Sequence, residues 1–153
     1  MVDVLEKALR SLPHGPEFRF VDRLTSLEPG KRGVGEYLVR ADEYYLKGHF
    51  PGCPLMPGVL LIEAGAQLAG MVAQSEPSIA PLADLKLTAL RAVKILGSAR
   101  PGERVVVEAS ISGRLGNLVQ AKVSAAVADV LVMTAELTLS GSAPAPATRE
   151  GSG

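Results

Sequence analysis

The strongest constraint on the fold is a loop rich in proline and glycine, residues 48–58, that leads directly into an apolar run. Pro51, Pro54 and Pro57 each fix the backbone angle φ, so this loop is stiff. A helix is expected over residues 58–74, with a proline immediately before it and apolar residues on nearly every side. Such a helix has no face suited to water, so it has to be buried in the core.

Two polar side chains interrupt this apolar helix. Glu63 and Gln67 are four residues apart, which places them on the same face. His49 lies in the stiff loop that precedes them. A histidine on a rigid loop and a carboxylic acid on a buried helix are the groups that acid–base chemistry requires. The loop and the helix together are therefore the candidate active site.

The composition is that of a single globular domain. The chain has 153 residues, of which 47% are hydrophobic, and its 16 basic and 16 acidic residues balance to zero net charge. This length favours one domain with its own core, which we place at residues 1–140. Residues 141–153 are small and proline-rich without periodicity, and we expect them to be a disordered tail. The balanced charge does not indicate a nucleic acid partner.

Cysteine content and hydropathy exclude further classes of site. Cys53 is the only cysteine, so no intrachain disulfide and no cysteine-based metal site can form. This fits a reducing, cytoplasmic location. The first residues lack the apolar core of a signal peptide, and the polar residues in the central helix argue against a membrane span. Neither a metal nor an organic cofactor is required by the pattern.

The rest of the chain shows the periodicities of a short helix, a hairpin and a run of antiparallel strands. We expect a helix over residues 2–11 and strands over residues 18–27, 33–40, 82–96, 105–112, 118–128 and 130–139. This order indicates an α+β fold in which a curved antiparallel sheet wraps around one apolar helix. One sheet face cannot cover a helix that is apolar all round, so a second copy of the chain is expected to complete the cover as a dimer.

The loop and the helix also carry a family signature. The FabZ-type (3R)-hydroxyacyl-[acyl-carrier-protein] dehydratases of type II fatty-acid synthesis have a signature that this chain resembles over His49-Phe50-Pro51-Gly52-x-Pro54-x-x-Pro57-Gly58-Val59-Leu60-x-x-Glu63-Ala64-x-Ala66-Gln67. Two further family motifs are similar to Leu12-Pro13-His14 and Pro101-Gly102-Glu103. The resemblance covers residues 5–139 and implies the hotdog fold, in agreement with the predicted order of elements.

The resemblance implies roles for three residues in dehydration. His49 corresponds to the catalytic histidine, which accepts the α-proton of the substrate. Glu63 corresponds to the carboxylic acid that protonates the leaving hydroxyl, and in the family it comes from the other subunit of a dimer. A glutamate here favours dehydration without the isomerisation that the aspartate-bearing FabA type performs. The backbone N–H of Gly58 matches the donor that stabilises the thioester oxygen.

Other residues complete the expected site. The carbonyl of Leu55 matches the acceptor that orients the histidine, and the His49–Phe50 bond is a candidate cis peptide beside the substrate. Gln67 is expected either to position Glu63 or a water molecule, or to be a structural hydrogen-bonding residue. His14 belongs to the N-terminal motif and is expected to have a structural role, and Cys53, with no base beside it in the sequence, is expected to be an ordinary loop residue.

The expected partner is acyl carrier protein bearing a 3-hydroxyacyl thioester. The assembly implied by the resemblance is a homodimer, or a hexamer built as a trimer of dimers. Several cations are either a docking surface for the acidic carrier or ordinary solvated charges, namely Lys86, Arg91, Lys94, Arg100 and Arg104.

Two segments depart from the family pattern, at residues 15–17 and residues 95–98. They are expected to border the acyl tunnel or the carrier surface, which leaves the acyl chain and the carrier open. A second hypothesis therefore keeps the chemistry but assigns it to a polyketide, aryl polyene or other specialised lipid pathway. A third hypothesis is a non-catalytic, acyl-binding hotdog subunit of a heteromer, against which the presence of both His49 and Glu63 argues.

Overall fold

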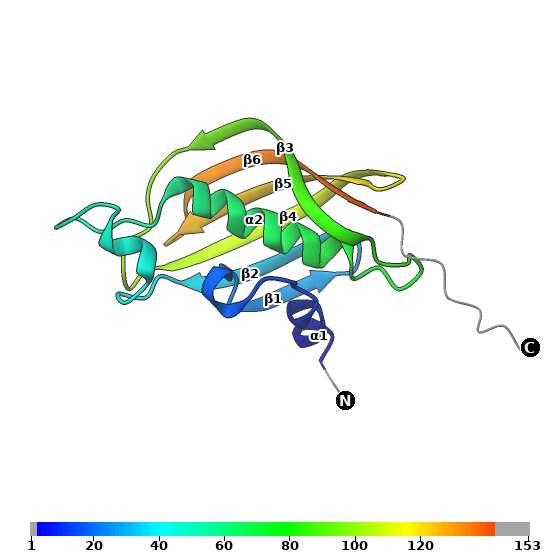
Figure 1. Ribbon diagram of the computed structural model, residues 1–153, viewed down its shortest axis with the longest axis horizontal. Coiled ribbons are helices and arrows are strands. Elements are labelled where there is room, and N and C mark those ends of the chain that lie inside the picture. Colours follow the sequence, from blue (N-terminus) through cyan, green and yellow to red (C-terminus); the bar gives the residue numbers. More distant parts are fainter. Residues whose placement is uncertain (1–2, 143–153) are drawn as a thin grey trace, which may run out of the picture.

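One antiparallel sheet of six strands curls around a long central helix in the computed structural model, which describes residues 3–142 (Figure 1). The helix α2, Gly58–Ala73, lies across the concave face of the sheet. The strands are arranged in the order β1-β2-β4-β5-β6-β3, so β3 crosses over to the far edge of the sheet. The predicted α+β class, with a curved sheet around an apolar helix, is confirmed.

The elements follow the predicted order along the chain. Helix α1 is Val4–Arg10, and two short 3-10 helices are η1, Pro16–Phe18, and η2, Tyr44–Lys47. The strands are β1 Arg23–Glu28, β2 Arg32–Leu38, β3 Ala83–Ile95, β4 Arg104–Leu115, β5 Leu118–Val127 and β6 Val130–Ser142. The predicted tail begins too early, because residues 141–142 belong to β6, and the rest of it lies outside the described residues.

The first strand begins five residues later than the strand predicted over residues 18–27. Phe18 ends η1, and its carbonyl oxygen accepts a hydrogen bond of 2.8 Å from the side-chain amide of Gln67 on α2. The N–H of Phe20 donates to the oxygen of the same amide at 2.9 Å. These backbone groups are bonded to the central helix instead of a neighbouring strand, so the apolar alternation around Phe18 does not produce a strand.

The single chain already covers most of the central helix. Nearly all residues of α2 from Leu61 onward are buried against the sheet and the segment that follows α1. The approach to β5 is closest at Gly65, where an added Cβ would lie 2.8 Å from a methyl group of Val123. Burial of α2 therefore does not by itself require the second copy that the sequence led us to expect.

Strand β3 is one of the two edge strands of the sheet. Within the described residues it pairs only with β6, and its apolar side chains Leu90, Val93 and Ile95 remain exposed. Three register shifts interrupt the β3–β6 pairing, and Ala92 adopts a positive φ of 52° in the last of them. Bulges of this kind bend and twist a strand, and Figure 1 shows β3 curving over α2.

Candidate active site

Backbone groups of Leu55 hold both the ring and the backbone carbonyl of His49. Its Nδ1 lies 3.0 Å from the Leu55 carbonyl oxygen, and the Leu55 N–H donates to the His49 carbonyl oxygen at 2.8 Å. A carbonyl oxygen can only accept a hydrogen bond, so the neutral ring carries its proton on Nδ1. The lone pair is then on Nε2, which makes that nitrogen the available base.

The loop that carries His49 is closed by its own backbone. The bond between His49 and Phe50 is cis, as the resemblance implies, and the two rings lie 4.1 Å apart between centroids. Phe50 and Cys53 exchange two backbone hydrogen bonds, of 3.3 and 2.9 Å. The N–H of Met56 donates to the Ala99 carbonyl oxygen at 2.9 Å, which ties the loop to the segment before β4. The stiffness predicted from the prolines is therefore supported by hydrogen bonds.

A buried pair of tyrosines anchors the segment that precedes this loop. The hydroxyl of Tyr37 on β2 lies 2.7 Å from that of Tyr45 in η2 and donates to Glu43 at 2.9 Å. Burial raises the pKa of Tyr45 to about 12, and it raises the pKa of Tyr37 further still. Both hydroxyls thus remain neutral hydrogen-bonding groups that hold η2, and the loop beyond it, against the sheet.

Gly58 is the first residue of α2. Its N–H belongs to the first turn, where amides have no carbonyl partner within the helix and the helix dipole favours negative charge. An added Cβ at this position would lie 3.2–3.3 Å from three carbons of Ile95. The side chain of Ile95, at the end of β3, therefore packs directly on the start of the helix. Residues 95–98, which differ from the family pattern, thus border the expected site.

The orientation of the Gln67 amide is determined by two backbone groups. Its oxygen accepts from the Phe20 N–H, so its nitrogen has to be the group that faces the Phe18 carbonyl oxygen. The remaining N–H of that nitrogen lies toward Glu63 Oε1 at 3.2 Å. Gln67 is only 2% exposed, and its hydrogen-bonding groups are all engaged. The amide therefore presents a fixed donor to Glu63.

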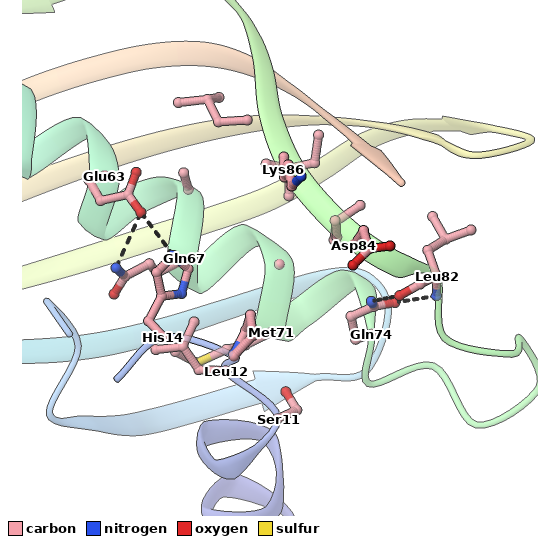
Figure 2. Close-up of a pocket in the computed structure, with 16 residues that line it drawn as sticks. Ser11, Leu12, His14, Glu63, Gln67, Met71, Gln74, Leu82, Asp84 and Lys86 are labelled. Carbon is pink, nitrogen blue, oxygen red and sulfur yellow. Dashed lines mark hydrogen bonds and ion pairs between the residues drawn. The ribbon is translucent and has the colours of Figure 1, made fainter. Parts of the chain in front are cut away.

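Glu63 lines a cavity of about 510 Å³ between α2, β3 and the segment after α1 (Figure 2). Most of its walls are aliphatic, with Leu12, Met71 and Leu85 among them, and Lys86 lies on the β3 side. Ligand sites commonly combine apolar walls with a few polar groups. The cavity is suited to an aliphatic chain attached to a group that can interact with the carboxyl of Glu63.

His14 lies at the same carboxyl group. Its Nε2 is 3.3 Å from Glu63 Oε1, and Figure 2 shows His14 and Gln67 converging on this oxygen. The sequence predicted only a structural role for His14, because its position in a Leu-Pro-His-Gly-Pro turn does not indicate what its ring touches. Contact with Glu63 depends on how the turn packs against α2, which no local pattern records.

His49 and Glu63 are not brought together within one chain. Each occupies the element that the sequence predicted, but His49 does not line the cavity beside Glu63, and no hydrogen bond or ion pair joins the two side chains. Across residues 3–142, no group of three or more His, Cys, Asp and Glu side chains is arranged to bind a metal ion. In the same range, no helix is long and apolar enough to cross a membrane.

Comparison with known proteins reveals extensive similarity. A family model described as FabA-like domain matches residues 12–136. The chain is 38% identical over 133 residues to the 3-hydroxyacyl-[acyl-carrier-protein] dehydratase FabZ of Chloroflexus aggregans, which covers 87% of this chain and 92% of that protein. The protein of the same name from Caldanaerobacter subterraneus is 39% identical, and the match covers 82% of this chain and 89% of that protein. The one from Clostridioides difficile is 36% identical, and the match covers 87% of this chain and 93% of that protein.

Solved structures agree on the fold. The dehydratase heterocomplex ApeI:P from Xenorhabdus doucetiae superposes with a TM-score of 0.75 at 17% identity, covering 90% of this chain and 91% of that one. Zebra fish thioesterase superfamily member 2 gives a TM-score of 0.65 at 16% identity, with coverages of 86% and 91%. At such identities the likeness establishes the architecture alone, which is the hotdog fold.

Proposed function

Because this chain belongs to the FabA-like family, we propose that it is an enzyme that dehydrates (3R)-hydroxyacyl-[acyl-carrier-protein] thioesters to trans-2-enoyl thioesters in type II fatty-acid synthesis. The observation that carries this proposal is the hydrogen bond between His49 Nδ1 and the Leu55 carbonyl oxygen, which leaves Nε2 as a free base. The similarity to the FabZ dehydratases over most of the chain supplies the reaction class and the carrier-bound substrate.

Two residues perform the proton transfers of the proposed reaction. Nε2 of His49 takes the α-proton, and the electron pair of the broken C–H bond shifts toward the thioester carbonyl, where the Gly58 N–H stabilises the oxygen. The same pair then forms the double bond between the α and β carbons as the β-carbon–oxygen bond breaks. Glu63 gives its proton to the departing hydroxyl, which leaves as water. Proton transfer through solvent from His49 to Glu63 restores both groups.

The reacting pair is shared between two subunits in this proposal. In one chain Glu63 lines a cavity that His49 does not reach, so each active site needs His49 of one subunit and Glu63 of another. The unpaired, apolar edge of β3 is the surface that a second copy would cover. These two observations support a homodimer, from which a hexamer can be built. A cytoplasmic location is part of the same proposal and fits the single cysteine.

A second candidate function has the same chemistry in a specialised polyketide, aryl polyene or lipid pathway. It differs from fatty-acid synthesis in the acyl chain of the substrate. Both segments that depart from the family pattern border the site: Ile95 packs on Gly58, and residues 15–17 follow His14. Turnover of carrier-linked short, long and polyene substrates separates the two candidates. A preference for ordinary saturated chains supports fatty-acid synthesis, and a preference for polyenes supports the specialised pathway.

The catalytic assignment is tested with the variants His49→Ala and Glu63→Gln. Each removes one proton-transfer group, so we expect the rate of dehydration and of the reverse hydration to fall by roughly 10²–10⁴. Unfolding curves and the oligomeric state serve as controls for an intact fold. Parent-like activity in folded His49→Ala would show that the site is assigned incorrectly, and an inactive parent would favour a non-catalytic subunit.

A further inference from the structure

We infer that His14 is a positioning residue for Glu63: together with Gln67 it holds Oε1 of the carboxyl group, so that the transferable proton resides on Oε2. This inference rests on the proposed function, since it gives Glu63 the role of the acid. Its basis is that two nitrogens, one from the segment after α1 and one from α2 itself, lie 3.3 and 3.2 Å from the same oxygen (Figure 2).

The tautomer of the neutral His14 ring follows from its other nitrogen. Nδ1 is buried, and within residues 3–142 it has no hydrogen-bond partner. A proton on Nδ1, in the neutral ring or in the imidazolium, would create a buried donor with no acceptor, which is more costly than a buried lone pair in a ring whose other nitrogen is satisfied. The neutral ring of His14 therefore carries its proton on Nε2, the nitrogen nearest Glu63.

Two nitrogens that lie close to one oxygen decide, in this inference, where the carboxyl group carries its proton. Gln67 can present only an N–H to Oε1, because its oxygen is engaged by the Phe20 N–H. With His14 as the second donor, both lone pairs of Oε1 are occupied. The protonated acid then carries its hydrogen on Oε2. Without His14, Oε1 can also carry the proton, and the fraction of Glu63 that is ready to donate falls.

The ring of His14 is itself held in place before substrate arrives. The side chain of Arg19 donates to the His14 carbonyl oxygen at 2.9 Å, and the ring stacks on Phe18 with a centroid separation of 6.0 Å and an interplanar angle of 28°. Leu12, two residues earlier, is buried in the core. The 3.3 Å between Nε2 and Oε1 is a close polar contact in the unliganded protein, and the contacts of catalytic groups often tighten into aligned hydrogen bonds only in the reacting complex.

The inference is tested with two substitutions of His14 and one matched control. His14→Phe keeps a ring against Phe18 but removes the N–H, and we expect kcat to fall by about 10- to 100-fold with KM unchanged, a part of the roughly 10²–10⁴ that a general acid supplies. His14→Gln places an amide N–H at similar reach and should recover most of that loss. Glu6→Gln, exposed on α1 and outside the segments that border the site, should retain the kcat of the parent.

The outcomes separate this inference from the proposed function. An inactive parent refutes the proposed function and the inference that rests on it. An active parent whose kcat is unchanged in His14→Phe, or a His14→Gln variant as impaired as His14→Phe, overturns the role of His14 alone. If His14→Phe does not fold, ¹⁵N NMR of the parent decides: the neutral Nε2–H tautomer of His14 supports the inference, and an Nδ1–H tautomer or an imidazolium overturns it.

Discussion

At the scale of single residues, contacts with backbone groups decide which form of a side chain is present. The Leu55 carbonyl oxygen places the proton of His49 on Nδ1, and the backbone of Phe18 and Phe20 turns the Gln67 amide so that its nitrogen faces Glu63. Backbone groups are fixed by the fold, so these orientations exist before substrate binds. The site is thus preorganised by its neighbours, as electrostatic stabilisation of a transition state requires.

The buried tyrosine pair predicts a loss of stability at high pH. Burial raises the pKa of Tyr45 from 10.0 to about 12, and that of Tyr37 further. Between these values the unfolded chain has lost phenolic protons that the folded chain retains, so the free energy of unfolding falls as the pH rises. The stabilisation is complete below the unfolded value and is lost as the pH rises through the folded value. Each tyrosine contributes a slope of up to about 1.4 kcal/mol per pH unit.

Urea unfolding at a series of pH values measures this slope directly. The variant Tyr45→Phe removes one of the two titrating hydroxyls, so its free energy of unfolding should decline less steeply than that of the parent above the ordinary tyrosine value. Equal slopes in the two proteins would mean that other groups cause the alkaline loss. Values for Tyr45→Phe are compared as slopes, because the lost hydrogen bond to Tyr37 also lowers its stability at neutral pH.

At the scale of elements, the distance between α2 and β5 depends on Gly65. A Cβ there would lie 2.8 and 2.9 Å from Cγ2 and Cβ of Val123, and the Val123 Cβ cannot move away by side-chain rotation. We expect Gly65→Ala to lower the free energy of unfolding by about 1–3 kcal/mol, as overpacked cores do. This cost exceeds the gain of about 1 kcal/mol that alanine brings over glycine in a helix.

Gly70 provides a matched control for this substitution. It lies in the same helix, but an added Cβ would meet its nearest neighbours at 3.9 Å, an ordinary contact. Gly70→Ala should therefore be neutral or stabilising by up to about 1 kcal/mol. Urea unfolding of both variants is the measurement. The same change in stability for Gly65→Ala and Gly70→Ala would rule out close packing of α2 on β5 as the reason for Gly65.

At the scale of the whole molecule, two features favour a second subunit beside β3. They are the exposed edge of that strand and the separation of His49 from Glu63 within one chain. An edge strand with unpaired backbone groups and apolar side chains is a template for a further strand. Pairing two β3 strands would cover Leu90, Val93 and Ile95 and bring a second subunit to the site.

Mixed dimers test whether the site is shared. His49→Ala and Glu63→Gln are each expected to be inactive, but a dimer with one chain of each kind contains one intact pair and one doubly altered pair. After random reassortment of equal amounts, half of the dimers are mixed, so activity should recover to about a quarter of the parent value. Two different affinity tags confirm that mixed dimers have formed. Mixed dimers without activity would show that both groups act within one chain.

The sequence by itself determined the elements and the residues of the candidate site. The prolines of the loop, the apolar run after Gly58 and the spacing of Glu63 and Gln67 are local patterns, and local patterns record backbone stiffness, burial and helical faces. Strand periodicity likewise placed the sheet, apart from residues 18–22. The α+β arrangement could be predicted because each element has one apolar face that only a second layer can bury.

Only the tertiary structure decided which groups meet. Four features depend on contacts between residues that are far apart in the chain. They are the late start of β1, the contact of His14 with Glu63, the orientation of Gln67 and the packing of Ile95 on Gly58. The cover of α2 by a single chain was also beyond prediction, since it depends on how far the sheet curls. Periodicity describes one element at a time, whereas these contacts depend on the distances and angles at which the elements pack.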